Sequence, residues 1–256
     1  MLETSKIWYP IDGQPSTFED STLIIPSVAI GNVSQLAIDL FIHTFSFEKI
    51  GNLSDIYMYP FAAPSDYRPE AESEGISTPI EVYYNSDFNL VLIQQRSPII
   101  PGFTAKFVEN VIIPFIELSK VKKLILLDSS DAGMVTELKP GLVRLYTNED
   151  LLDKSFESLK LTKHAIPLYQ EPYDHSLFIL KLTDSLRGRD LKTIEIKVLV
   201  SYVYEGDNFE DGEVLANELI KLADLSQPSN WTRPVSWLGV YGDMPVPSAM
   251  EEGLYG

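Results

Sequence analysis

The sequence predicts an α/β fold, a three-layer sandwich with a central mixed sheet flanked by helices, followed by an extended C-terminal tail. Residues 122–127 join two lysines to an unbroken apolar run, which is typical of a strand buried in the middle of such a sheet. Residues 80–84 and 90–95 are β-forming runs on either side of a polar turn, so we expect an antiparallel hairpin. Residues 33–41 repeat apolar side chains at helical spacing, which predicts a helix packed on the sheet.

The predicted fold begins with a strand, a turn and a helix. Residues 22–27 are typical of a short buried strand. Gly31 and Asn32 then turn the chain, and the Asn32 side chain is expected to cap the helix that begins near Val33. Because the apolar face of this helix is wide, we expect it to be largely buried against a sheet or a partner.

Further elements are predicted on either side of the hairpin. Residues 55–59 are a second strand candidate, and residues 62–79 are rich in proline, serine and acids, as in a long surface loop. Thr104 is expected to cap a helix with one apolar side. Pro114 should bend that helix, because proline removes a backbone hydrogen bond.

The second half of the chain gives clear signals only near its end. Residues 135–189 offer three short candidates: strands at 142–146 and 177–182 and a polar helix at 148–159. Residues 193–204 alternate apolar and polar side chains, which predicts a strand with one face in the core. A helix is expected from about Asp211 to just before residue 226.

Domain boundaries follow from these elements. We expect a loose leader at residues 1–17, a single α/β domain at 18–228, and an aromatic strap with a C-terminal docking tail at 229–256. Residues 242–253 have little hydrophobic periodicity and suit an extended arm. Packing on the domain or a protein interface would both suit the strap residues, which are Trp231, Arg233, Trp237 and Tyr241.

Charge and composition argue against several classes of function. The chain has 37 acidic and 20 basic residues, and its net charge of -17 repels phosphate backbones and anionic membranes. It has no cysteine, which excludes a disulfide scaffold, a thiolate zinc site and a cysteine nucleophile. No apolar stretch is long enough to span a bilayer. We therefore expect no nucleic-acid or membrane partner and no cofactor, in a protein of the cytoplasm or also of the nucleus.

Few groups suggest catalysis. The segment after the central strand lies where open α/β sheets place ligands, yet no nucleotide-binding or hydrolase motif accompanies it. Turn formation and helix capping are therefore the favoured roles of Asp128, Ser129, Ser130 and Asp131. The histidines have no metal-ligand spacing, so we expect no metal at His43, His164 or His175.

A second acidic segment follows the strand predicted at 193–204. It consists of Glu205, Gly206, Asp207 and Asn208. Two carboxylates this close would suit acid–base chemistry or an ion. A glycine turn, with Asp207 or Asn208 capping the next helix, explains the same residues more simply.

Four segments together resemble the proteasome assembly chaperone 2 family. They are PSVAIGNVSQLAIDL at 26–40, IQQRSP at 93–98, EGDN at 205–208 and RPVSWLGVYG at 233–242, and the last is similar to fungal members in particular. The end of the chain, Leu254-Tyr255-Gly256, resembles the hydrophobic-Tyr-X motif by which partners dock onto the proteasome.

The resemblance implies a non-enzymatic subunit that pairs with proteasome assembly chaperone 1. The pair would bind the outer face of the proteasome α-ring, promote ring assembly and block premature docking of regulators. Leu254, Tyr255 and Gly256 would enter a pocket between α subunits, where the terminal carboxylate meets a lysine. As fold or heterodimer elements it implies Gly31, Asn32, Leu36, Asp39, Glu205, Gly206, Asp207 and Asn208.

Two other interpretations stay open from the sequence. One is an α/β enzyme acting on a nucleoside-like small molecule, with residues 128–131 and Asp207 around a pocket. The other is an acidic interaction module with no link to the proteasome.

Overall fold

The computed structural model describes residues 6–15, 17–67, 75–134, 141–147, 176–187, 189 and 194–238. One mixed sheet has eight strands in the order β1-β3-β6-β7-β2-β8-β10-β9. Their bounds are β1 (Trp8–Pro10), β2 (Thr22–Pro26), β3 (Glu48–Leu53), β6 (Ile80–Asn85), β7 (Leu90–Gln95), β8 (Lys123–Asp131), β9 (Val143–Thr147) and β10 (Glu195–Val203). A separate pair joins β4 (Ala63–Pro64) to β5 (Ile76–Ser77).

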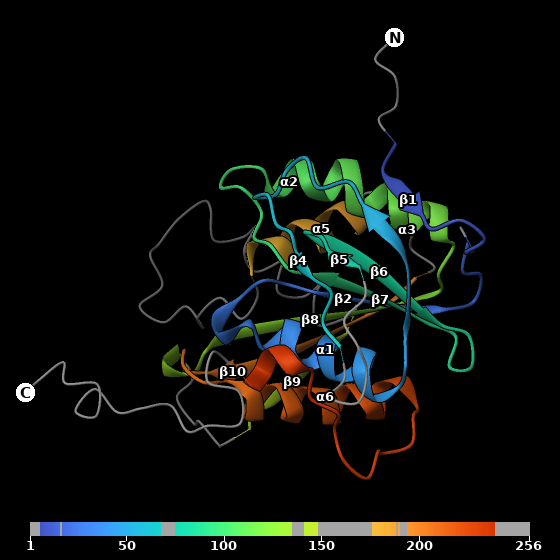
Figure 1. The fold of residues 1–256 in the computed structure, drawn as a ribbon. Helices are drawn as coiled ribbons and strands as arrows, with labels where there is room; N and C mark the ends of the chain where they lie inside the picture. Colours follow the sequence, from blue (N-terminus) through green and yellow to red (C-terminus); the bar gives the residue numbers. More distant parts are fainter. Residues whose placement is uncertain are drawn as a thin grey trace, which may run out of the picture.

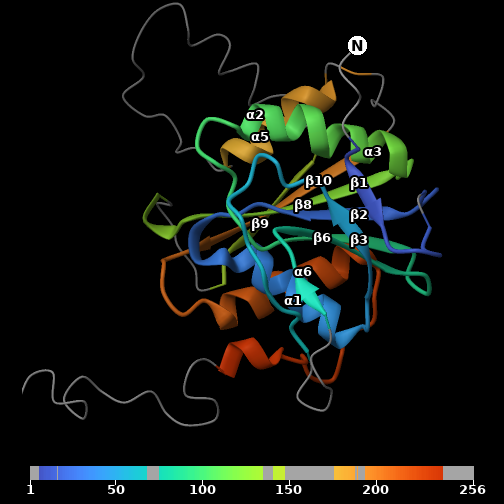
Figure 2. The same ribbon diagram turned by 45° about the horizontal axis from the view of Figure 1, so that its top comes forward.

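Helices cover both faces of the sheet, so the predicted three-layer sandwich is confirmed (Figures 1 and 2). One layer contains α2 (Thr104–Phe107), η2 (Val108–Ile112), α3 (Ile113–Ser119) and α5 (Leu177–Arg187). The other contains α1 (Val33–Thr44) and α6 (Phe209–Ala223). Short 3-10 turns are η1 (Ile30–Asn32), η3 (Ala132–Met134) and η5 (Val235–Leu238).

The centre of the sheet is parallel. β2 pairs in parallel with β7 and β8, and β8 with β10. Along β8, Leu124 and Leu126 face one core while Ile125 and Leu127 face the other. The strand predicted at 122–127 is therefore buried on both faces, as expected. The turn predicted at residues 128–131 is wrong, because β8 continues to Asp131 in register with β10.

The other half of the sheet is antiparallel. β6 and β7 form the predicted hairpin, and β3 pairs with β6. The strand predicted at 55–59 is wrong: the strand is Glu48–Leu53, and Met58 makes only an isolated bridge to Ile99. The segment expected to be a loose leader contains β1, which pairs with β3 and buries Trp8.

The first helical layer contains one long interrupted helix. At η2 the backbone widens to a π-turn, in which the Ile113 N–H donates to the Val108 carbonyl. Pro114 follows directly and has no N–H to donate, so the interruption falls where the sequence predicts a bend. The predicted Thr104 cap is wrong, since Phe103 is at the N-cap and no side chain caps the helix.

Residues 177–182 belong to helix α5, so the strand predicted there is wrong. The buried positions Phe178, Ile179, Leu182 and Leu186 are three or four residues apart, which is helical spacing. The predicted window was too short to include Leu186 and to show this period.

The second helical layer covers the opposite face. α1 and α6 bury their apolar sides with Ile24, Leu92, Ile125 and Leu199 of the sheet. β10 therefore has helices on both sides, with Val198 in one core and Leu199 in the other. The expectation that only one face of this strand is buried is wrong.

Candidate functional site

The predicted site residues at the start of α1 and before α6 meet in the structure. An added Cβ on Gly31, which has φ +65°, would lie 2.3 Å from Asn208 Oδ1. Asn208 is buried and holds its own loop: Nδ2 donates to the Tyr204 carbonyl at 2.8 Å and to Asp211 Oδ2 at 2.7 Å. Glycine is therefore required at position 31 by both the backbone angle and the contact.

The capping roles predicted for this region are only partly correct. Asn32 is exposed and has a left-handed backbone, and its side chain caps nothing in α1. Asn208 Oδ1 accepts from the Gly206 N–H at 3.0 Å and does not cap α6. Asp207 Oδ1 accepts weakly from the Phe209 N–H at 3.4 Å. Glu205, Gly206 and Asp207 are exposed.

The packing of α1 on α6 depends on a second close approach. An added Cβ on Gly212 would lie 2.7 Å from Leu36 Cβ. The two helices can approach this closely because Gly212 has no side chain. Leu36 is thus placed in the contact between the two helices.

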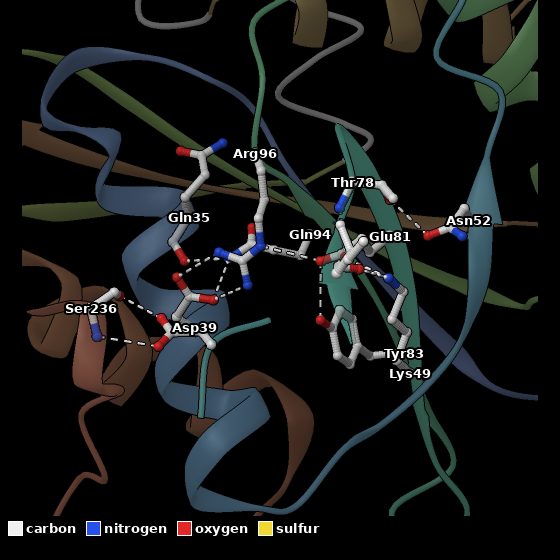
Figure 3. Close-up of polar contacts among 12 residues, drawn as sticks. Gln35, Asp39, Lys49, Asn52, Thr78, Glu81, Tyr83, Gln94, Arg96 and Ser236 are labelled. Atoms are coloured by element: carbon white, nitrogen blue, oxygen red, sulfur yellow. Dashed lines mark hydrogen bonds and ion pairs between the residues drawn. The ribbon is translucent and has the colours of Figure 1, made fainter. Parts of the chain in front are cut away.

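Asp39 lies on α1 and forms a buried ion pair with Arg96, which follows β7 (Figure 3). Arg96 NH2 donates to Asp39 Oδ1 at 2.9 Å and NH1 to Asp39 Oδ2 at 3.3 Å. Gln94 Nε2 donates to Asp39 Oδ1 at 2.7 Å and to the Gln35 carbonyl at 3.0 Å. The contact joins the first two segments of the family resemblance, residues 26–40 and 93–98.

Arg96 also joins Asp39 to a second buried acid, Glu81 on β6 (Figure 3). Arg96 Nε donates to Glu81 Oε2 at 3.1 Å, and Lys49 Nζ to Glu81 Oε1 at 2.5 Å. Tyr83 OH donates to Glu81 Oε2 at 3.1 Å. We call these five residues, Asp39, Lys49, Glu81, Tyr83 and Arg96, the ionic cluster. The two negative charges of Asp39 and Glu81 equal the two positive charges of Lys49 and Arg96.

Burial and charge set the protonation of the ionic cluster. Burial alone would lower the pKa of Arg96, but Asp39 and the other acidic partners outweigh it and raise that pKa above its ordinary value. Burial, followed by the charge of Glu81, raises the pKa of Tyr83. Arg96 is thus charged and Tyr83 neutral, and the cluster fixes α1 on the sheet.

Asp128, the centre of the enzyme alternative, is fully buried in β8. Its Oδ1 accepts from Ser27 Oγ and from the Ser129 N–H at 3.0 Å, and its Oδ2 from the Ser176 N–H at 2.6 Å. Burial raises its pKa to about 6 against the lowering effect of these donors. Asp128 thus links β2 and β8 to the start of α5. Both of its carboxylate oxygens accept hydrogen bonds from groups of the fold itself.

Of the remaining predicted positions, some pack within the domain and the others lie outside the described residues. Trp231 of the strap lies 5.8 Å from Phe41 and 6.1 Å from Phe45 between ring centroids, so this part packs on the domain. His43 is buried on α1. The helix candidate at 148–159 and the tail motif lie outside the described residues, as do His164, His175, Tyr241, Leu254, Tyr255 and Gly256.

The described residues offer neither a cluster of metal-binding side chains nor a helix that could cross a membrane. No group of three or more His, Cys, Asp or Glu side chains suited to hold a metal ion occurs there. Among the helices described, none has the length and apolar character needed to cross a membrane.

Glu81 and Lys49, whose charges complete the ionic cluster, were not among the residues predicted from the sequence. A signal for Glu81 exists: it is an acid between Ile80 and Val82 in a β-forming run, and such an acid is seldom buried without a cation. The sequence of this run does not identify the cation, because Lys49 and Arg96 lie on other segments.

Known proteins are similar to this chain over most of its length. The model of the PAC2 family matches residues 23–219. Proteasome assembly chaperone 2 of Mus musculus is 30% identical, with 86% of this chain and 91% of the mouse protein covered. The Saccharomyces cerevisiae protein of the same name is 26% identical, with 87% and 95% covered.

Solved structures show the same fold at lower identity. Pyrococcus furiosus PbaA, described as an archaeal homolog of proteasome-assembly chaperone, has a TM-score of 0.58 at 15% identity, with 84% of this chain and 86% of PbaA covered. A PAC2 family protein from Streptomyces avermitilis has a TM-score of 0.54 at 16% identity, with 82% and 88% covered. Since the family model spans most of the chain and the mouse relative aligns along nearly all of it, this chain belongs to the PAC2 family.

Proposed function

We propose that this chain is a non-enzymatic subunit of a proteasome assembly chaperone. The observation that carries the proposal is that relatives named Proteasome assembly chaperone 2 align along nearly their whole length, 91% in mouse and 95% in yeast. The ionic cluster and the Gly31–Asn208 contact support it, because they join three of the segments that resemble this family. The protein would act in the cytoplasm, or in both the cytoplasm and the nucleus.

In this proposal the chain pairs with proteasome assembly chaperone 1, and the pair binds the outer face of the α-ring. It promotes ring assembly and blocks premature docking of regulators. A net charge of -17 suits a partner surface that is basic.

The tail supplies the second contact. The Leu254 side chain and the ring of Tyr255 suit an apolar slot, and the phenol can still find a hydrogen-bond partner. The carboxylate of Gly256 suits a lysine at the base of the slot. A tail contact worth only a few kcal/mol gains strength when the folded pair binds at the same time.

Removal of the tail motif tests this function. Deleting residues 254–256 should weaken binding of the heterodimer to α-rings by about 30-fold, if the motif contributes about 2 kcal/mol. The matched control deletes residues 248–250, which removes the same length of arm and keeps the motif. Equal binding of both deletions and the native pair would refute the role of the tail.

The partners are tested by purifying the tagged full chain from cells and identifying the chains that accompany it. We expect proteasome assembly chaperone 1 and α subunits. A purification that recovers neither would contradict the proposed function and favour the acidic interaction module.

A further inference from the structure

The strap, residues 229–238, follows helix α6 back toward its beginning. Trp231 Nε1 donates to Asn217 Oδ1 at 3.1 Å. Arg233 Nε donates to Glu213 Oε1 at 2.8 Å, and the Trp237 ring stacks on Phe209 with centroids 4.6 Å apart. The three helix partners, at 217, 213 and 209, are four residues apart and lie on one face of α6. The strap therefore runs antiparallel to α6 and ends at its first turn.

Hydrogen bonds also fix the opposite side of the strap. The Thr232 N–H donates to Thr44 Oγ1 at 3.0 Å, at the end of α1. The Val235 N–H donates to the Tyr67 carbonyl at 3.0 Å. Ser236 donates to both carboxylate oxygens of Asp66, from its N–H at 3.2 Å and from its hydroxyl. In Figure 2 the red segment that includes η5 lies against the outer side of the α1 and α6 layer.

These contacts fix the position of the strap along α6. From Asn217 to Phe209 is eight residues of helix, or about 12 Å along the axis. The strap thus carries the chain back from the end of α6 to the end of the domain where Asn208 meets Gly31. Trp237, next to the last residue of the strap, therefore lies at the first turn of α6.

We propose that Arg233, Ser236 and Trp237 are positioning residues. They fix the root of the docking tail, the point just after Leu238, at the first turn of α6. This inference rests on the proposed function, in which the tail enters a pocket on the α-ring. Each of the three holds the strap by a different contact: an ion pair, a hydrogen-bonded carboxylate and a ring stack. The Arg233 guanidinium also lies over the Trp237 ring, 5.8 Å from its centroid, so the effects of substituting these two residues should not simply add.

A fixed root shortens the tether. Eighteen residues follow Leu238, whereas twenty-four follow Thr232, which Thr44 still holds when the strap beyond it is released. If the effective concentration of the tail falls roughly as the −3/2 power of tether length, this release lowers it by about 1.5-fold. The root also becomes free to move away from the first turn of α6, and the tail loses its fixed starting point.

Two spin labels measure the position of the root directly. The chain has no cysteine, so Glu210→Cys and Leu238→Cys give specific labels at the first turn of α6 and at the end of the strap. We expect a short, narrow distance distribution in the native strap. The double substitution Arg233→Ala and Trp237→Ala should make it longer and broader, and Trp237→Phe alone should retain it. An unchanged distribution in the double variant would overturn the proposal.

The functional readout uses the same variants as heterodimers. The double variant should bind α-rings about 1.5-fold more weakly, with unchanged heterodimer affinity and circular dichroism. Tyr59→Ala, which removes an exposed ring far from the strap in sequence, is the control and should change neither readout.

The two proposals fail in different ways. If a released strap leaves α-ring binding unchanged while deletion of residues 254–256 weakens it, the positioning role is wrong and the proposed function stands. If neither change affects binding, the tail has no docking role; the distances still decide whether the strap fixes its root.

Discussion

Replacing Arg96 with methionine should lower the free energy of unfolding by about 3–5 kcal/mol, the usual cost of breaking a buried ion pair from one side. The side chains of Arg96, Asp39 and Glu81 are only 15%, 8% and 0% exposed, so water cannot replace the lost donors. Methionine keeps much of the aliphatic stem, which limits the contribution of a cavity. Most of the loss then comes from carboxylates left without their partner.

The loss should fall unequally on the two acids. Glu81 would keep Lys49 Nζ at 2.5 Å, the Thr78 N–H at 3.1 Å and Tyr83 OH at 3.1 Å. Asp39, among the described contacts, would keep Gln94 Nε2 at 2.7 Å. In the Arg96→Met background, Asp39→Asn should therefore restore about 1–2 kcal/mol, and Glu81→Gln should restore less.

Urea unfolding, followed by tryptophan fluorescence and circular dichroism, measures these differences. The slope with denaturant should stay constant, so that the change lies in the midpoint. A loss below about 1 kcal/mol in Arg96→Met, or no recovery in the double variant with Asp39→Asn, would refute the reasoning.

Three further predictions concern other contacts of the fold. Gly31→Ala should destabilise by about 2–4 kcal/mol in urea unfolding, because alanine disfavours positive φ and its methyl group would collide with Asn208. Gly212→Ala should destabilise by about 1–3 kcal/mol through Leu36, although alanine favours helices; a stabilised variant would contradict this close contact. The folded pKa of Asp128, about 6, lies above its ordinary value of 3.8, so its contribution is fully present below pH 3.8 and is lost as pH rises through 6. Relative to Asp128→Asn, the native protein should lose up to about 3 kcal/mol of unfolding free energy across that range, and a difference independent of pH would argue against the raised pKa.

Elements with a long or regular pattern were predictable from the sequence. The apolar run at 122–127 and the hairpin at 80–84 and 90–95 are each specified by a few neighbouring residues, and the structure confirms both. Residues 177–182 were misread because a short apolar run fits a strand or a helix, and the distinguishing residue, Leu186, lies further along. The edge strand Trp8–Pro10 depends on pairing with β3, which no local pattern reveals.

The polar contacts of the candidate site were less predictable, for a related reason. The resemblance named Asp39 as a site residue and included Arg96 only within the segment 93–98, and their pairing joins positions 57 residues apart. Asn208 looked like a helix cap because its type and place suit one. In the structure its side chain closes its own loop instead, and it lies against Gly31 from another motif.

Fold and docking are separable in this protein. Gly31, Asp39 and Asn208 are committed to intramolecular contacts, so substituting them should first reduce the amount of folded chain. The tail motif follows the strap by more than a dozen residues of different composition, and its removal should leave unfolding unchanged. The strap takes part in both fold and docking. Trp237 contributes to packing through Phe209 and, in our proposal, to docking through the tether. Substitutions in the strap should therefore change stability and α-ring binding together, which neither the buried motifs nor the tail should do.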